Sequence, residues 1–378
     1  MICIIIFPEY SYNSSLEGLN LWFNIVCPAL LPFFICIEIL IGLGVVSFLG
    51  AVFAPLMGFL FNVPGEGAFA FIMSIASGYP IGANTVATLL KENACSKTEA
   101  QRMLSLCSTS GPLFIIGAVS IGIFKNPEIG LILVVSHYLS AISSGLIMRF
   151  YKIKEQSDKK NSFTNPFKEL SKHRKKDNRP IGKIIADSIK NAVNLILIVG
   201  GYIVFFSVIS KILMVTGILS IIPESINRFL NAEIVSIDNW SALTVGILEV
   251  TNGIKECAKL DIPFITKIVY TSFFIGFGGF SVNAQVSGVI QNTDLNFPLY
   301  LLIKLFQGIA AALYSLLLLK LNLPKYTFNY FIRKHPYSII SLGEIAVLSL
   351  YSLIKIFTVL TLLSTFIICF KKIRNIMT

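Results

Sequence analysis

The chain has 378 residues, of which 54% are hydrophobic and 13% are charged, against about 25% charged in an ordinary soluble domain. Its mean hydropathy is +0.76, and it contains 30 phenylalanines. The apolar runs are too many and too long for one soluble core, so this composition excludes an ordinary soluble domain.

Apolar segments recur along the chain at residues 25–50, 66–90, 103–124, 129–150, 188–213, 240–257, 264–290, 297–320 and 340–370. Each is close to the ~20 residues that a helix needs to cross a bilayer. We therefore predict an all-α polytopic protein of a cell membrane, with about 8–10 transmembrane segments. The start, "MICIIIFPEY", has a short apolar run without a preceding positive region, which is not typical of a signal peptide.

The net charge of +11 is concentrated in one polar stretch. Residues 152–183 hold eleven Lys and Arg against four acids, a net of +7. The positive-inside rule predicts that residues 151–185 form a basic cytoplasmic linker. Few aromatic residues are interleaved with the charges, so we expect contact with anionic lipid headgroups rather than with nucleic acid.

Counting crossings outward from this linker predicts on which side each loop lies. Residues 125–128, 214–239 and 291–296 fall outside, and residues 91–102, 255–267 and 320–336 fall inside. One crossing by 340–370 would then place Lys371, Lys372 and Arg374 outside, against the rule. Either 340–370 is a hairpin or some broken segment does not cross. The count makes the two halves parallel, whereas one re-entrant segment in each half would make them inverted.

We expect the chain to divide into a first transmembrane repeat (1–150), the linker, a second repeat (186–320) and a tail (321–378). The tail holds a basic loop, an apolar segment and a basic end. Three pairs of segments match: "SLEGLNLWFNIVCPALLPFFICIEIL" with "DSIKNAVNLILIVGGYIVFFSVISKIL", "MSIASGYPIGA" with "VGILEVTNGIKE", and "LCSTSGPLFIIGAVS" with "YTSFFIGFGGFSVNAQVSG". Interrupted apolar segments in matching positions of two halves indicate a transporter binding site. The alternative is that Gly and Ser only let helices pack closely.

A helix broken at mid-membrane exposes N–H groups that favour anions and carbonyls that favour cations. We therefore expect the substrate-binding residues at the breaks. In the first half the candidates are Ser77, Gly78, Tyr79, Pro80, Gly82, Asn84, Ser108, Ser110 and Gly111. In the second half they are Glu249, Thr251, Asn252, Gly253, Gly278, Gly279, Asn283 and Gln285.

Four ionisable residues inside the apolar segments are candidates for proton or charge coupling. Glu249 lies near the middle of 240–257, where a carboxylate is costly and by default marks an ion or proton path. The alternative is a Glu capped by a helix partner, or one that faces the cytoplasm through a short span. Glu38 is a similar case. His137 is either a proton relay or a satisfied structural group. Lys304 is either a counter-charge for an anion or a side chain that snorkels to the interface.

Four motifs of the first half, "LLPFFI" (30–35), "SGYPIGA" (77–83), "STSGPLFIIGAVSIGIF" (108–124) and "SHYLSAISSGLIMRFY" (136–151), resemble the YlbJ-type sporulation integral membrane proteins. "EVTNGI" (249–254) and "GFGGFSVNAQ" (276–285) extend the resemblance into the second half. These proteins belong to the wider group with the Gate domain of nucleoside transporters and FeoB GTPases.

This resemblance implies an integral membrane protein of endospore formers, located in the forespore or mother-cell membrane, that moves a small solute as the spore matures. Dipicolinate is the cargo that the resemblance suggests. The alternative function is a non-transporting assembly factor with membrane partner proteins. The chain has no G-x-x-x-x-G-K-[ST], no H-E-x-x-H and no metal-ligand spacing among its seven cysteines. We therefore expect no enzyme activity, no cofactor and no metal.

Overall fold

The computed structural model describes residues 2–153, 165–230 and 236–321. Within these ranges the chain forms helices joined by turns and contains no strand. Five of the described helical segments are long and apolar enough to cross a bilayer: Pro8–Gly42, Glu128–Met148, Ile181–Val215, Phe264–Ile290 and Phe297–Lys320. The prediction of an all-α polytopic membrane protein is confirmed. The predicted segment 340–370 and the basic tail lie outside the described residues.

The elements of the first half are α1 (Ile2–Ile6), α2 (Pro8–Leu21), the π-helical η1 (Trp22–Val26), α3 (Cys27–Gly42), α4 (Val45–Phe61), α5 (Gly67–Ser77), α6 (Ile81–Lys91), α7 (Lys97–Leu106), the π-helical η2 (Phe114–Ile123) and α8 (Glu128–Met148). Those that follow are α9 (Pro166–Asp177), α10 (Ile181–Val215), α11 (Ile221–Leu230), α12 (Ile237–Leu248), α13 (Val250–Lys259), α14 (Phe264–Phe277), α15 (Gly279–Ile290) and α16 (Phe297–Lys320). Each half has a long helix, a shorter helix, two short helices around a break, an interrupted segment and a closing helix. This order is compatible with two repeats.

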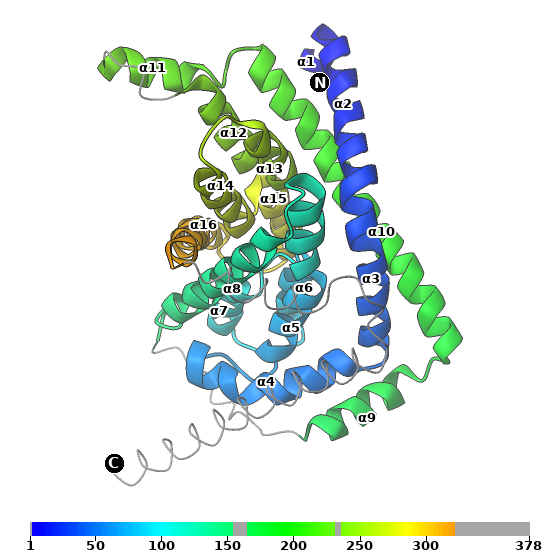
Figure 1. The fold of residues 1–378 in the computed structure, drawn as a ribbon. Coiled ribbons are helices and arrows are strands. Elements are labelled where there is room, and N and C mark those ends of the chain that lie inside the picture. The colour runs from blue at the N-terminus through cyan, green and yellow to red at the C-terminus, as the bar shows by residue number, and fades with distance from the viewer. Residues whose placement is uncertain (1, 154–164, 231–235, 322–378) are drawn as a thin grey trace. The chain divides into compact units, whose positions relative to one another are not determined.

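The long helices that open the two halves lie side by side and run in opposite directions (Figure 1). Near the start of the first helix, Gly18 lies against Ser207 at the far end of α10. At its end, Gly42 lies against Ile184 at the start of α10. Between them the Trp22 indole donates to the Ile196 carbonyl at 3.0 Å. Antiparallel opening helices favour the inverted arrangement of the halves over the parallel one.

Helices α5 and α6 form a re-entrant hairpin instead of one crossing. In a continuous helix, residues eight positions apart are separated by about 12 Å along the axis. Here Gly82 lies so close to Ser74 that a Cβ at Gly82 would overlap the Ser74 side chain and the Cys107 carbonyl. The chain therefore reverses between α5 and α6, and only glycine allows the two short helices to pack this closely.

Helices α12 and α13 form the equivalent hairpin in the second half. A Cβ at Gly253 would overlap the Gly246 backbone, although the two residues are seven positions apart. Gly246 in turn lies against the Phe274 ring of α14. The two segments predicted as transmembrane spans 66–90 and 240–257 are thus hairpins, and their tips lie inside the protein.

These hairpins correct the predicted sides of several loops. The count placed 125–128 and 255–267 on opposite sides, yet the Phe124 and Phe264 rings lie 6.2 Å apart. It also separated 91–102 from 291–296, yet the Gln101 amide donates to the Asn296 carbonyl at 3.1 Å. The count was wrong because it treated each broken apolar segment as a crossing, whereas a hairpin returns the chain to the side from which it came.

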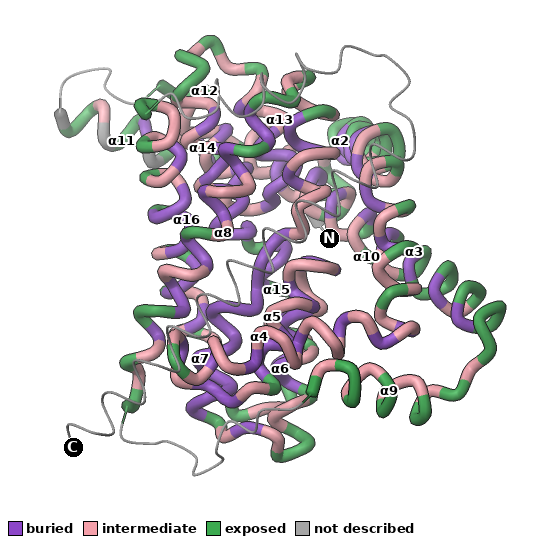
Figure 2. Tube along the Cα trace, turned by 60° about the horizontal axis from the view of Figure 1, so that its bottom comes forward, coloured by how far each residue is buried: buried purple, intermediate pink, exposed green. Residues whose placement is uncertain are grey.

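Each hairpin packs against the interrupted segment of the other half. The largest buried cluster joins Val86 of α6 and Leu104 of α7 to Val286 of α15. A second cluster joins Ile115 of η2 to Ile254 of α13. Buried residues accordingly gather where the hairpins and the interrupted helices meet, whereas α9 has no buried residue (Figure 2). This crossed packing brings all four breaks to the middle of the protein.

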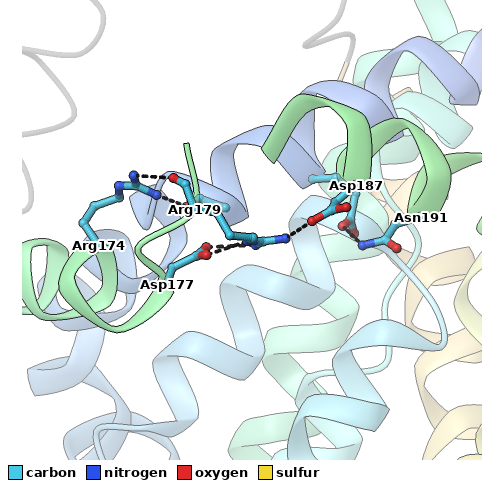
Figure 3. Close-up of polar contacts among 7 residues, drawn as sticks. Arg174, Asp177, Arg179, Asp187 and Asn191 are labelled. Atoms are coloured by element: carbon cyan, nitrogen blue, oxygen red, sulfur yellow. Dashed lines mark hydrogen bonds and ion pairs between the residues drawn. The ribbon is translucent and has the colours of Figure 1, made fainter. Parts of the chain in front are cut away.

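The described part of the basic linker is pinned to the start of α10 (Figure 3). The Arg174 guanidinium donates to the Gly42 carbonyl at 3.2 Å and to the Arg179 carbonyl at 3.1 Å. Arg179 bridges Asp177 and Asp187, with a shortest distance of 2.5 Å to each carboxylate. The hydrogen bonds from Arg179 lower the pKa of Asp177 from 3.8 to about 2. The remainder of the predicted linker, residues 154–164, lies outside the described residues.

Candidate functional site

A cavity of about 70 Å³, here called the inner cavity, lies where the breaks of the two halves meet. The breaks contribute Ser77, Gly78, Tyr79, Ser110, Gly111, Phe114, Glu249, Val250, Thr251, Ser281, Val282 and Gln285. The opening helices contribute Leu30, Phe33, Phe34, Val199, Tyr202 and Ile203. This volume exceeds the 10–15 Å³ or so that one water needs. Residues predicted from four separate segments of the sequence thus share one cavity.

The tip of the first hairpin is tied to both halves. Gly78 has φ of 72°, a left-handed conformation that favours glycine. A Cβ there would lie 3.0 Å from the Gly111 backbone nitrogen, so the tip closely approaches the interrupted segment that follows α7. The Tyr79 hydroxyl donates to the Ile275 carbonyl of α14 at 2.6 Å. Pro80 follows directly and precedes the first residue of α6.

Buried side chains satisfy the backbone groups that the break between α7 and η2 leaves without helical partners. The Thr109 N–H donates to Ser74 Oγ at 3.0 Å. The Ser110 N–H donates to His137 Nε2 at 2.9 Å, and the Tyr138 hydroxyl donates to the Ser110 carbonyl at 2.9 Å. His137 therefore supports the break. Its Nδ1 is buried without a hydrogen-bond partner among the described residues.

Lys304 of α16 is fully buried, so the structure contradicts the snorkelling interpretation. Its ammonium donates to the Ser108 carbonyl at 2.9 Å and to Gln307 Oε1 at 2.8 Å. It also lies 5.4 Å from the centre of the Tyr79 ring, which is cation–π geometry. In the described part of the chain no carboxylate lies within ion-pair distance of it. Lys304 thus holds the first hairpin tip and the neighbouring break from behind the cavity wall.

Glu249 forms the tip of the second hairpin, where it ends α12 and caps α13. Its carboxylate accepts hydrogen bonds from the N–H groups of Thr251 at 3.0 Å and of Asn252 at 2.6 Å. The side chain is buried and also lines the inner cavity. Gly279, with φ of 68°, lies against the backbone of this tip. Glu249 is therefore a helix cap that also faces the cavity, and its role in an ion or proton path stays a prediction.

Four helices, α6, η2, α13 and α15, begin at or beside the inner cavity. Glu249 caps α13, whereas no side chain caps α6, η2 or α15. The first turn of a helix has N–H groups without intrahelical partners and a partial positive charge. Three uncapped helix starts around one cavity create an environment that favours an anion.

Aromatic rings form much of the remaining wall, and sequence reasoning missed most of them. Phe33, Phe34, Phe114 and Tyr202 line the inner cavity together with Tyr79. Phe33 and Phe34 lie in the "LLPFFI" motif, and the family resemblance of this motif could have pointed to them as site residues. Tyr202 lies in the uniformly apolar α10, where nothing in the sequence separates it from lipid-facing residues.

Several predicted site residues pack the breaks without lining the cavity. Gly82 and Gly253 sit inside the hairpins. Ser108 shares a hydrogen bond of 2.8 Å with the Tyr300 hydroxyl. The Asn283 amide donates to the Phe277 carbonyl at 3.3 Å. Gly278 joins α14 to α15 with φ of 83°. They shape the breaks through close backbone approach and buried hydrogen bonds.

Three predicted residues lie elsewhere. Asn84 is exposed on α6. Glu38 accepts a hydrogen bond from Asn191 at 3.0 Å, at the contact between α3 and α10. Asn252 lines a second, separate cavity. In the described part of the chain no group of three or more His, Cys, Asp or Glu side chains is arranged to hold a metal ion.

Comparison with known proteins supports one family. The Gate family, described as nucleoside recognition, matches residues 23–154. The chain is 38% identical over 331 residues to the sporulation integral membrane protein YlbJ of Bacillus subtilis (strain 168), which covers 86% of this chain and 80% of that protein. No solved structure gives a significant match. The chain therefore belongs to the YlbJ family of sporulation integral membrane proteins.

Proposed function

We propose that the protein is a permease that moves a small anionic solute across a membrane during endospore formation. The inner cavity is the observation that carries this proposal, because it joins the breaks of both halves at the centre of the protein. Non-helical backbone deep inside a membrane protein is tolerated where it is packed in protein or lines a water-filled cavity. Here it does both.

The cavity wall supports a flat, aromatic anion as the solute. Uncapped starts of α6, η2 and α15 favour negative charge. The rings of Phe33, Phe34, Tyr79, Phe114 and Tyr202 offer surfaces against which a planar ring stacks. Dipicolinate, a planar ring with two carboxylates, combines both properties and is the cargo that the family resemblance suggests.

Glu249 gives this proposal a coupling mechanism. A charged carboxylate that faces the cavity would repel an anionic solute, and a neutral one would not. The solute therefore enters together with a proton that neutralises Glu249, and an ionisable group buried in the membrane is by default part of such a path. Proton release would strengthen the hydrogen bonds from the Thr251 and Asn252 N–H groups, because a charged carboxylate is the better acceptor.

The assembly-factor alternative draws on a different surface. Helix α9 has no buried residue and ends with Arg174, Lys175 and Lys176 in its last turn. Such a basic face suits anionic headgroups or an acidic partner. If the protein acts by assembly, this face matters more than the inner cavity.

Complementation of Bacillus subtilis that lacks YlbJ separates the two functions. The readout is dipicolinate in the spore and in the mother cell, with the membrane level of each variant as a control. If the protein is a permease, the Glu249→Gln variant should accumulate dipicolinate in the mother cell and form spores that contain little of it. The control variant, Glu38→Gln, changes a carboxylate that lies away from the cavity and should behave as wild type. If the protein is an assembly factor, the opposite is expected. The Glu249→Gln variant should form normal spores, and a variant with neutral residues in place of Lys172, Arg174, Lys175 and Lys176 should form defective spores.

A further inference from the structure

A second cavity, here called the outer cavity, lies between α2, α10 and α13. Its volume is about 180 Å³. Its lining is mainly polar and consists of Ser14, Glu17, Ser207, Ser210, Lys211, Met214, Val245, Asn252, Lys255, Glu256 and Lys259. Lys211 lies near the end of α10 that is opposite to α9, about 45 Å along the helix axis from Ile181.

The outer cavity carries an excess of positive charge. Three lysines and two glutamates line it. Lys255 pairs with Glu17 at 3.1 Å, and Lys259 pairs with Glu256 at 2.8 Å. Among the described residues no carboxylate lies within ion-pair distance of Lys211, whose ammonium lies 6.0 Å from the Tyr10 ring centre. Glu17 also interacts electrostatically with Lys211, and three lysines against two glutamates give the lining a net charge of +1.

The lining of the outer cavity also includes a polar group without a hydrogen-bond partner among the described residues. Ser210 Oγ is buried and makes no hydrogen bond with the described residues. A buried hydroxyl normally has a partner, because a buried polar group without a hydrogen bond destabilises the folded protein. A carboxylate bound next to Lys211, or a water molecule bound to that carboxylate, would supply the hydrogen-bond partner that Ser210 Oγ lacks.

Only a thin wall separates the two cavities. Ile203 and Thr251 line the inner cavity, and Ser207 and Asn252 line the outer one. The Asn252 side-chain amide donates to Ser207 Oγ at 2.8 Å and to the Ile203 carbonyl at 3.3 Å. Both acceptors lie on α10, so this amide joins α13 to α10 between the two cavities, and the backbone N–H of Asn252 is held by Glu249.

We propose that the outer cavity is the entrance for the anionic solute, with Lys211 as the attracting charge and Asn252 as the gate to the inner cavity. This rests on the proposed permease function. The predicted cytoplasmic position of α9 puts this entrance on the opposite, non-cytoplasmic face. Neutralisation of Glu249 weakens its hydrogen bond from the Asn252 N–H, because a charged acceptor bonds more strongly than a neutral one, and this links the state of the inner cavity to the gate.

The first test measures the charge preference of the cavity without any transport. Ser210→Cys is labelled with an anionic and with a cationic thiol reagent of similar size, and mass spectrometry quantifies the peptide that contains position 210. Relative to Ser225→Cys on the exposed surface of α11, the anionic reagent is expected to be favoured about tenfold. The extra substitution Lys211→Gln should abolish the preference. Equal preferences at positions 210 and 225 would overturn the proposal.

The second test measures dipicolinate transport in proteoliposomes. Lys211→Gln should raise the KM for dipicolinate about tenfold with an unchanged maximal rate, because it weakens attraction and leaves the inner cavity intact. Lys190→Gln, on the same helix but outside both cavities, is the matched control. If Lys211→Gln changes neither parameter while Glu249→Gln stops transport, the entrance is refuted and the permease stands. If the wild type itself moves no dipicolinate, the permease fails, and the labelling ratio still decides the charge of the cavity.

Discussion

The Tyr79 hydroxyl donates to the Ile275 carbonyl at 2.6 Å, so the tip of the first hairpin is bonded to the interrupted helix of the second half. Behind the same ring lies the Lys304 ammonium, which holds the Ser108 carbonyl. Tyr79 and Lys304 together thereby connect the first hairpin tip, the break that follows α7, and α14 of the second half. The inner cavity depends on this junction, because Tyr79 forms part of its wall.

Tyr79→Phe tests the junction by removing a single hydroxyl. We expect the protein to lose about 0.5–1.5 kcal/mol of stability, the usual net value of one hydrogen bond, and to lose most of its solute transport. Tyr314→Phe is the control, since it removes the hydrogen bond to Ser143, away from both cavities. The measurements are thermal unfolding in detergent and transport in vesicles. Similar transport by the two variants would show that the junction has no special role.

Gly253→Ala tests the close packing of the second hairpin. The added Cβ would overlap the Gly246 backbone, which no side-chain movement relieves. Overpacking of this kind costs about 1–3 kcal/mol, so the unfolding temperature should fall. Gly288→Ala, whose Cβ meets nothing within 4 Å, should unfold as wild type. An unchanged unfolding temperature for Gly253→Ala would argue against the re-entrant hairpin.

Lys304→Met tests whether the buried ammonium positions the first hairpin tip. Methionine keeps the length and apolar body of the side chain, but it cannot bond to Ser108 or Gln307. We expect normal membrane levels and about a tenfold weaker affinity for the solute, equivalent to 1.4 kcal/mol. Lys320→Met, at the end of α16, serves as the control. A solute affinity equal to that of wild type would exclude this role for Lys304.

The junction of α9 and α10 should depend on pH. The Arg179 hydrogen bonds lower the pKa of Asp177 to about 2, below the 3.8 of the free group. A lowered pKa stabilises the folded junction above pH 3.8 or so, and this contribution is lost as the pH falls through 2. Hydrogen exchange of α9, corrected for intrinsic rates, should therefore show lower protection at pH 2.5 than at pH 5. In Arg179→Gln this difference should disappear, and a difference of the same size in that variant would contradict the assignment.

Hydropathy predicts the membrane helices well because a bilayer sets the length of an apolar helix. Hydropathy could not separate a crossing from a hairpin, since the segment "MSIASGYPIGA" has the same hydropathy whether it crosses the membrane or turns back. The distinguishing signal is the length of each piece: α5 and α6 have 11 residues each, too few to cross alone. Gly82 and Gly253 marked the hairpins, but a glycine in an apolar segment also serves helix packing in general.

The candidate site was predictable where the backbone breaks, and much less so elsewhere. Gly78, Gly111 and Glu249 stand out because Gly, Pro and charged residues interrupt a helix that lipid would otherwise favour. Tyr202 does not stand out, because an aromatic residue in an apolar helix faces lipid, core or cavity with the same sequence pattern. The direction of Asn84 on α6 could not be predicted either, since it depends on how the hairpin packs.

Uptake of dipicolinate by proteoliposomes that contain the purified protein tests the central claim most directly. The claim predicts that wild-type protein accumulates dipicolinate when a proton gradient is imposed, and that Gly111→Leu, which adds a side chain at the wall of the inner cavity, does not. Gly288→Leu, on an exposed surface, should transport as wild type. Wild-type vesicles that take up no more dipicolinate than empty ones, or a Gly111→Leu variant that transports normally, would contradict it.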